Sequence, residues 1–500
     1  MFSASGFRII LVVTLYSFAW NTLAQDVSEK KSVPLTGQQL FERKWTANDP
    51  VAKGDGLGPL FNATSCVECH IQGGVGGAGP NELNLQLVGV HWDRLTANQI
   101  SQKRDDIKSI HPRLPEIRSM VLHRQSTDSK FESWRYEVLG MKVSSKLRRQ
   151  GLTDYNRDRF DRLIMNRSSK NSGPDFFKSH DVPLVRTERN TPSLFGAGLI
   201  DAISEDAMIE LCDQQLGREF GVSGRLSRAH PEFEDPLAAK PDAKDKPVKK
   251  IGKFGWKGQT ASLKEFVVSA CANELGLQTE NHPQADVILA SHKHFLVGFR
   301  DNDLSNKQCE NLVDYVGKLP PPRQHSSLPS HRLRYGELIF ENVGCATCHM
   351  RKVDQVDGLY SDLLLHDMGA TLADPVLAKA AEDDPIEVPL QPPKKATGNA
   401  YESSFDRSLV DGRSRAEVDN KIRELSREWR TPPLWGIADS APYLHDGRAE
   451  TLHDAIILHD GESAMIRRRY LELSVDDRKA LLQFLNSLTN KPADAVAINR

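Results

Sequence analysis

The chain has 500 residues, of which 39% are hydrophobic and 26% charged, enough apolar material for a buried core. Its 65 lysines and arginines nearly balance 67 acidic residues, so it has no overall positive charge that would recruit nucleic acid. The mean hydropathy of −0.47 excludes a protein with many membrane spans, and seven cysteines are too few for a disulfide scaffold.

The first residues have the pattern of an export signal. Arg8 supplies a positive charge, residues 9–20 are apolar, and Thr22-Leu23-Ala24 fits a cleavage site for small residues. The apolar run is about a dozen residues long, shorter than the roughly 20 that span a bilayer. We therefore expect a signal peptide over residues 1–24 and a periplasmic mature chain without stable membrane insertion. An uncleaved N-terminal anchor is the alternative.

Four of the seven cysteines form two identical motifs for attaching c-type haem. Residues 66–70 (CVECH) and 345–349 (CATCH) both read C-x-x-C-H. Two thiols on one helical turn can add across the two vinyl groups of the macrocycle, and the adjacent histidine then lies beneath the iron. Two copies in an exported chain disfavour a zinc knuckle or a redox pair. The predicted haem attachments and proximal iron ligands are Cys66, Cys69, His70, Cys345, Cys348 and His349.

The segments around the two motifs resemble each other in the same order along the chain, which indicates a tandem duplication. Each half also closes with an amphipathic helix, expected over Leu304–Leu319 and Leu473–Leu488. The matched pairs of segments are 37–41 with 336–340, 189–196 with 429–436, and 258–266 with 447–455. We therefore expect a mostly α fold made of two related haem domains.

The domains are expected at residues 33–319 and 332–490, joined by a Pro/Ser-rich linker at 320–331. The first half is about 110 residues longer than the second, because it carries insertions at about 91–180 and 226–250.

The first insertion contains helical stretches such as 133–149, and the second is expected to be an exposed loop. The second half has its own polar insertion at 374–419. The charges of these insertions favour a solvated surface over a docking patch.

With these motifs, the sequence resembles the bacterial di-haem cytochrome c peroxidases and the related di-haem maturase of methylamine utilisation. It is most similar to the di-haem oxidoreductase branch of that superfamily. The resemblance covers most of the mature chain except the insertions. It implies two cytochrome c-like helical domains, with peroxide activated at one haem and electrons relayed by the other.

Two positions of the first half match residues that the family uses in catalysis. Residues 254–258 (FGWKG) resemble the aromatic-Trp-Asp-Gly block whose tryptophan lies between the haems, so the resemblance implies an electron relay at Trp256. Lys257 replaces the aspartate of that block. Residues 273–275 (NEL) resemble Val-Glu-Met, whose glutamate sits over the peroxide-binding iron, which implies proton transfer by Glu274. A core tryptophan and a surface glutamate are the alternatives.

The resemblance also indicates distal iron ligands. Residues 442–447 (PYLHDG) match the family's Pro-Tyr-Phe-His-Asp-Gly, and counting onward places His459 where the peroxidases have a methionine and the maturase a tyrosine. Met368 is the competing ligand of the second haem. A histidine would lower the reduction potential of that haem relative to a thioether. For the first haem, His91, His123 and an open site are the three options.

Family members hold Ca²⁺ between the domains, which implies a calcium site at the Asn190 side chain and the carbonyls of Ser440 and Pro442. The three cysteines outside the motifs are an odd number, so at least one is a free thiol or pairs with another molecule. Buried free cysteines usually behave as small hydrophobes. These cysteines are Cys212, Cys271 and Cys309.

These expectations combine into an exported di-haem enzyme, a c-type oxidoreductase of cytochrome c peroxidase type. Electrons would come from a small donor protein of cytochrome c or cupredoxin type, enter at the second haem and reach peroxide or a similar oxidant at the first. The alternatives are a non-enzymatic di-haem electron carrier and a maturase-like oxidase of a protein substrate. A homodimer is left open, and no nucleic-acid partner is expected.

Overall fold

The computed structural model of the chain describes residues 35–95, 97–111, 114–115, 119–128, 130–145, 173–215, 221–229, 250–284, 301–324, 327–374 and 426–490. The predicted signal peptide lies outside these residues, as do most of the insertion at 226–250 and nearly all of that at 374–419. Gly37–Arg500 form one compact unit, and every contact given below lies within it. Among the described residues, no helix is both long and apolar enough to cross a membrane.

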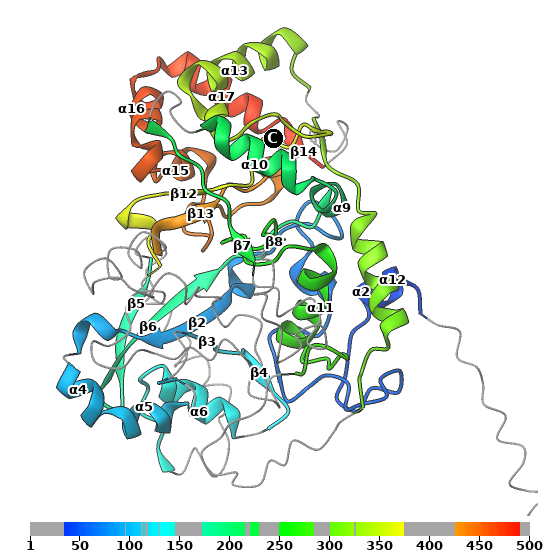
Figure 1. Ribbon diagram of the computed structural model, residues 1–500, viewed down its shortest axis with the longest axis vertical. Helices are drawn as coiled ribbons and strands as arrows, with labels where there is room; N and C mark the ends of the chain where they lie inside the picture. The colour runs from blue at the N-terminus through cyan, green and yellow to red at the C-terminus, as the bar shows by residue number, and fades with distance from the viewer. Residues whose placement is uncertain are drawn as a thin grey trace, which may run out of the picture. The chain divides into compact units, whose positions relative to one another are not determined.

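Helices surround the first motif, and short strands connect them (Figure 1). The helices are α2 (Gly37–Glu42), α3 (Cys66–Cys69), α4 (Ala97–Gln102), α5 (Arg104–Ile110), α6 (Phe131–Val138), α9 (Ala197–Asp201), α10 (Glu205–Gln215), α11 (Leu263–Glu274) and α12 (Asn306–Gly317), with 3₁₀ turns at Asn81–Leu83 and Trp92–Arg94. The strands are β1 (Leu60–Phe61), β2 (Leu85–Val90), β3 (Met120–Val121), β4 (Gln125–Ser126), β5 (Asp175–Ser179), β6 (Val182–Arg189), β7 (Arg228–Ala229) and β8 (Lys250–Ile251).

The second half has fewer elements around its motif. Its helices are α13 (Ser330–Val343), α15 (Leu452–Ile457), α16 (Ala464–Glu472) and α17 (Val475–Leu485), with 3₁₀ turns at Cys345–Thr347, Ala370–Leu372, Ile437–Asp439 and Gly461–Ser463. Its strands are β9 (Arg323–Gln324), β10 (Lys352–Val353), β11 (Val356–Asp357), β12 (Leu365–Asp367), β13 (Glu428–Arg430) and β14 (Leu488–Thr489). The predicted closing helices of both halves are confirmed as α12 and α17.

In each half, the helix before the motif packs against the closing helix (Figure 1). A glycine permits this approach of α2 to α12 and of α13 to α17. A Cβ atom at Gly37 would lie 2.0 Å from the carbonyl oxygen of Asn311, and one at Gly336 would lie 2.2 Å from that of Ala480. The glycines of the segments 37–41 and 336–340 therefore make equivalent close contacts.

Replacing Gly336 with alanine is expected to destabilise the protein by about 1–3 kcal/mol, the usual cost of overpacking. The new Cβ would meet the backbone of α17, which cannot move aside as a flexible side chain could. This cost exceeds the gain of up to about 1 kcal/mol that alanine brings to a helix. The midpoint of urea unfolding should fall.

Gly317→Ala is the matched control for this prediction. Gly317 is also helical, but its nearest neighbour to an added Cβ is a flexible Leu263 side-chain atom at 3.4 Å. This variant should leave the urea midpoint unchanged or raise it slightly. An unchanged midpoint in Gly336→Ala would show that the α13–α17 contact is looser than described.

Equivalent contacts also recur around the other matched segments. The amide of Leu194 donates to the carbonyl of Gly76 at 2.8 Å, and that of Leu434 donates to Leu359 at 3.1 Å. The segments 189–196 and 429–436 thus lie at comparable places behind their motifs. The helices that follow begin alike, because a hydroxyl caps each of them: Ser262 caps α11, Ser305 caps α12, Thr451 caps α15 and Ser474 caps α17.

The first insertion contains an antiparallel sheet that the expected, mostly α fold did not include. Four strands lie in the order β3-β2-β6-β5, and β2 pairs with β6 from Leu85↔Arg189 to Val90↔Leu184. Residues of the sheet and of α5 and α6 form a separate apolar core. The helix predicted over 133–149 is shorter, because α6 ends at Val138 and Gly140 adopts a φ of 75°.

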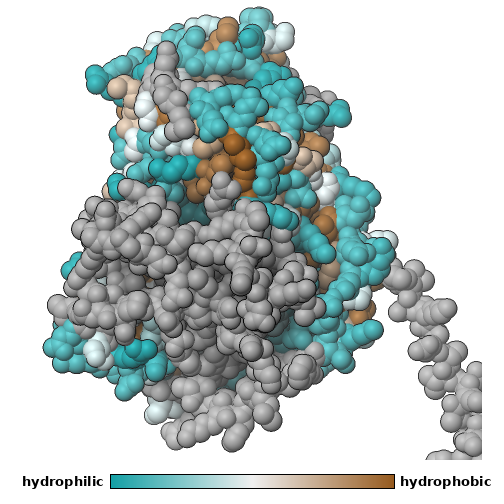
Figure 2. Space-filling view, viewed as in Figure 1, coloured by the Kyte–Doolittle hydropathy of each residue, from teal (hydrophilic) through white to brown (hydrophobic). Residues whose placement is uncertain are grey.

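Polar atoms dominate the coloured part of the surface in Figure 2. Brown atoms are visible where α9 and α10 run, and Leu199 and Ile209 on these helices are among the exposed apolar residues. Isolated exposed apolar side chains are ordinary for a folded domain.

Candidate haem sites and the contacts between them

Each C-x-x-C-H segment forms one turn that is closed by the same hydrogen bond. The amide of His70 donates to the carbonyl of Cys66 at 3.0 Å, and that of His349 donates to Cys345 at 2.9 Å. In the first motif, the Ser65 hydroxyl caps the turn. The turn places both cysteines and the following histidine of each motif within a few ångströms of one another, as attachment of one macrocycle requires.

The two motif histidines are oriented alike. Nδ1 of His70 lies 3.1 Å from the carbonyl of Gly77, and Nδ1 of His349 lies 3.0 Å from that of Tyr360. Each carbonyl can accept the Nδ1 proton, which leaves Nε2 as the metal ligand. Burial lowers the pKa of both histidines to about 4, so both rings are neutral and keep the lone pair that iron needs.

A second imidazole faces the motif histidine of the second half. The ring centroids of His349 and His459 are 6.5 Å apart. Nδ1 of His459 lies 2.7 Å from the carbonyl of Ala455, so its Nε2 is also left for a ligand, and burial lowers its pKa. Metal–imidazole bonds are about 2.0–2.1 Å long, so this ring separation leaves room for one metal ion between the rings. Met368, the competing residue, follows β12, and its amide donates to Arg427.

No second imidazole faces the motif histidine of the first half among the described residues. The ring recorded against His70 is that of Phe41, with centroids 6.3 Å apart. His91 packs on Phe176 and follows the end of β2, roughly 20 Å along that strand from Leu85.

The other distal candidate, His123, has a structural environment. It is buried, and its Nε2 lies 3.0 Å from the carbonyl of Asn273. Burial lowers its pKa to about 4, so its ring is neutral. The choice among His91, His123 and an open site stays a prediction.

Glu274 stands beside the first motif, as the last residue of α11. Burial and the neighbouring Glu274 carboxylate raise the pKa of Cys69 to about 12, which places that carboxylate near the thiol. Asn62 fixes the glutamate twice, because its side-chain amide donates to Oε2 at 2.8 Å and its main-chain amide donates to the Glu274 carbonyl at 2.7 Å. The amide of Arg124 in turn donates to Oδ1 of Asn62 at 3.0 Å. The carboxylate is therefore held in place by the chain itself.

Trp256 lies where the two halves meet. Its indole nitrogen donates to the carbonyl of Asn190 at 2.8 Å, and its own carbonyl accepts from the amide of Arg430 at 2.9 Å. Lys257, at the position of the family's aspartate, donates through Nζ to the carbonyls of Ser426 and Glu428. Its amino group also lies 3.6 Å from the centroid of the Trp429 ring.

The sequence analysis did not single out the stack between Trp429 and His445. Their ring centroids are 3.6 Å apart and the rings are nearly parallel, at 10°. Both side chains are buried, and the Trp429 indole donates to the carbonyl of Leu372 at 2.8 Å. Arg189 lies over the tryptophan at 4.9 Å. The only signal in the sequence was that His445 belongs to the matched segment 442–447.

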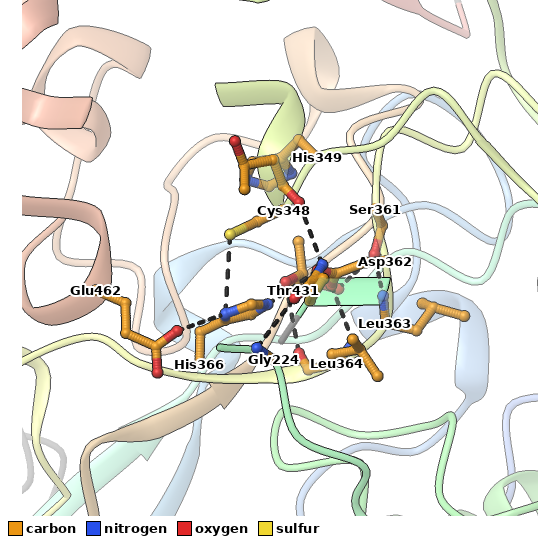
Figure 3. A network of polar contacts seen from close by, with 12 residues as sticks. Gly224, Cys348, His349, Ser361, Asp362, Leu363, Leu364, His366, Thr431 and Glu462 are labelled. Atoms are coloured by element: carbon orange, nitrogen blue, oxygen red, sulfur yellow. Dashed lines mark hydrogen bonds and ion pairs between the residues drawn. The ribbon is translucent and has the colours of Figure 1, made fainter. Parts of the chain in front are cut away.

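His366 and two carboxylates form a buried network next to the second motif (Figure 3). Nε2 of His366 lies 2.9 Å from Asp362, and Nδ1 lies 2.9 Å from Glu462 and 3.8 Å from the sulfur of Cys348. Burial opposes a charge on His366, but the Asp362 carboxylate outweighs it and the pKa of His366 lies well above its ordinary value.

Cys348, Asp362 and His366 also come close enough together to hold a metal ion. A protonated imidazole has no lone pair for a metal, however, and the motif commits the Cys348 sulfur to haem attachment. The cluster therefore fits an ion-paired support of the second motif better than a separate metal site.

The predicted calcium residues lie at the contact between the halves. The Asn190 side chain donates to the carbonyl of Gly79 and to Oδ1 of Asn84, both at 3.0 Å. Ser440 and Pro442 flank Ala441, whose carbonyl accepts from the side chain of a first-half residue, Gln72. A calcium ion at Asn190, Ser440 and Pro442 stays a prediction.

All seven cysteines fall within the described residues, and none is in a disulfide. The Cys212 thiol donates to the carbonyl of Gly224 at 3.2 Å. Cys271 and Cys309 are buried on the neighbouring helices α11 and α12. Burial raises the pKa of Cys271 well above its ordinary value and that of Cys309 to about 11, so both thiols stay protonated.

A family model described as "Di-haem oxidoreductase, putative peroxidase" matches residues 5–114, 156–384 and 403–488. These segments make up well over half of the chain, which therefore belongs to the di-haem oxidoreductase family.

Hydrazine synthase subunit gamma of Kuenenia stuttgartiensis is 27% identical over 199 residues, which are 37% of this chain and 51% of that protein. The chain thus spans about half the length of this curated relative. Two solved structures are similar to parts of the chain. Kuenenia stuttgartiensis hydrazine synthase under xenon pressure has a TM-score of 0.28 at 19% identity, covering 60% of this chain and 72% of that one. A MauG-like protein associated with microbial copper homeostasis has a TM-score of 0.23 at 17% identity, covering 38% and 55%. The assignment rests on the family match.

Proposed function

We propose that this member of the di-haem oxidoreductase family is an exported c-type cytochrome with peroxidase activity. Electrons from a small donor protein would enter at the second motif and reach peroxide or a similar oxidant at the first. The difference between the two sites carries this proposal. His459 faces His349 at 6.5 Å, whereas Glu274 stands beside Cys69 and no described imidazole faces His70. Two imidazoles suit electron transfer, and a carboxylate beside an open position suits proton-coupled reduction.

The side chains at both motifs fit a covalently bound haem c. His70 and His349 are neutral and oriented through Nδ1, and each follows two cysteines on one turn. Phe41 and Phe340 lie at matching distances from these histidines, 6.3 and 6.4 Å between ring centroids. When bound, the two haems supply the iron that exchanges electrons and binds the oxidant. The recurring caps, glycine contacts and motif turns support a tandem pair of cytochrome c-like domains.

The chain itself contributes proton transfer and positioning at the first site. Reduction of peroxide requires that the leaving oxygen be protonated, and a carboxyl group can carry that proton between the two oxygens. Glu274 takes this role, and Asn62 keeps its carboxylate directed by the hydrogen bond to Oε2. Trp256 bridges Asn190 and Arg430 and would bring the two halves into electronic contact.

The mature protein would act in the periplasm after removal of residues 1–24, because covalent haem c is assembled outside the cytoplasm. Its donor would be a small soluble cytochrome or cupredoxin. The ion between the halves would be Ca²⁺, with the main-chain oxygens of Ser440 and Pro442 as candidate ligands.

Binding of an external ligand to one haem only is the direct test of this proposal. Cyanide added to the oxidised protein, or carbon monoxide added to the reduced protein, should change the Soret spectrum of half of the haem. The protein should also reduce hydrogen peroxide with an artificial electron donor. A spectrum unaffected by both ligands in every redox state, with no peroxide turnover, would favour a non-enzymatic electron carrier.

His459→Ala is expected to convert the second haem from low spin to high spin, because it removes one of two imidazoles that face a common ion. Absorption and electron paramagnetic resonance spectra of the oxidised protein measure this change. Met368→Ala is the control and should leave the spectrum as in the wild type. A near-infrared methionine–iron band that disappears in Met368→Ala would reverse the ligand assignment.

A further inference from the structure

A continuous series of contacts leads from the first motif to the second through side chains with no role in the proposed reaction. It begins at the main chain of Cys69, which packs so closely on Gly79 that a Cβ there would lie 2.6 Å from the Cys69 carbonyl oxygen. The carbonyl of Gly79 accepts from the Asn190 side chain at 3.0 Å. The main-chain amide of Asn190 then donates across to the second half, to the carbonyl of His445 at 2.7 Å.

The series continues through aromatic rings to the second motif. His445 stacks on Trp429 with ring centroids 3.6 Å apart. Trp429 on β13 lies directly opposite His366 on β12, and residues opposite each other in an antiparallel pair share one face with Cβ atoms about 4.5–5.5 Å apart. His366 reaches the sulfur of Cys348 at 3.8 Å (Figure 3).

We propose that the His445–Trp429 stack is the route by which electrons cross between the two haem sites. The inference rests on the proposed function, because it assumes a haem at each motif. The rings are 5% and 6% exposed, so water does not separate them. Burial holds the pKa of His445 well below its ordinary value, so a neutral ring faces the indole.

Neighbouring residues fix the stack in one geometry. Lys257 lies over the indole at 3.6 Å and is itself anchored to the carbonyls of β13 and the residue before Arg427. The indole nitrogen is anchored to Leu372. Trp256, the relay implied by the family resemblance, shares Asn190 with this route but leads to the main chain of Arg430. Lys257 is thus a positioning residue for Trp429.

The electron count is simple. Each electron delivered by the donor protein reduces the iron at the second motif from Fe(III) to Fe(II), and its passage through the stack reoxidises that iron and reduces the iron at the first site by one unit. Two such passages and two protons convert one hydrogen peroxide to two water molecules. The stack itself is neither oxidised nor reduced overall.

Pulse radiolysis of the di-haem protein tests the route directly, because a rapidly injected electron redistributes between the haems and the Soret spectrum follows it. Trp429→Leu should slow this redistribution about tenfold, equivalent to about 1.4 kcal/mol in the activation free energy. The reduction potentials of both haems, measured by spectroelectrochemical titration, should stay unchanged. Trp429→Phe keeps a ring on His445 and should transfer electrons faster than Trp429→Leu.

Trp435→Leu is the matched control, because Trp435 is equally buried in the same segment but lies outside the series. It should keep the wild-type rate. His445→Leu keeps the main-chain carbonyl that accepts from Asn190 and should slow transfer as Trp429→Leu does, so it replaces that variant if Trp429→Leu loses haem. Wild-type rates in both stack variants, or a fall confined to Trp256→Leu, would overturn the proposal. Fast transfer in a protein that does not reduce peroxide would refute only the proposed function.

Discussion

The double variant Cys66→Ala/Cys69→Ala is expected to retain one covalently bound haem per chain, against two in the wild-type protein. Each motif supplies its own pair of thiols on a turn closed by its own hydrogen bond, from His70 to Cys66 and from His349 to Cys345. Attachment at one motif therefore does not depend on the thiols of the other. A pyridine haemochrome titration against protein concentration measures the ratio, and haem staining of a denaturing gel shows that the haem is covalent.

Two further variants make this result specific. Cys345→Ala/Cys348→Ala should also leave one haem. Cys271→Ala should keep both, although Cys271 is a buried cysteine close enough to Cys66 to influence its own pKa through that thiol. A wild-type ratio of zero or one, or loss of both haems from either double variant, would contradict two independent attachment sites.

The features that could be predicted from the sequence are those with local causes. The C-x-x-C-H turns and the N-caps at Ser262 and Thr451 depend on residues within four or five positions of one another. The closing helices follow from their apolar periodicity. The order of matched segments added a long-range expectation, because a duplicated segment makes the same contact in both halves, as Leu194 and Leu434 do.

The features that could not be predicted depend on residues far apart in the chain. β2 and β6 pair although about 90 residues separate them, and β6 alone reads as a short apolar run that a helix could also explain. The departure at Lys257 weakened the family match, yet the lysine side chain contacts Trp429 and β13. No spacing in the sequence indicates that His445 would stack on a tryptophan 16 positions earlier.

Glu274→Gln is expected to lower peroxide turnover by about 10²–10⁴-fold, the usual contribution of a general acid–base group. Glutamine has nearly the same shape and can still accept the hydrogen bond that Asn62 donates at 2.8 Å. It cannot carry a proton between the two peroxide oxygens. The melting temperature should therefore barely move, and both haems should remain bound. Steady-state peroxide reduction with an artificial donor gives the turnover, and calorimetry gives the melting temperature.

Glu68→Gln separates proton transfer from a general effect of negative charge near the motif. Like Glu274, the Glu68 carboxylate raises the pKa of Cys69, but it is exposed and accepts from the amide of Thr64 at 2.8 Å. Removing its charge should leave turnover within a few-fold of the wild type. Equal losses in the two variants would mean that charge near the first haem, and not a proton carried by Glu274, sets the rate. Full turnover in Glu274→Gln would exclude this carboxylate from the reaction, and the proton would then have to come from solvent through the open side of the site.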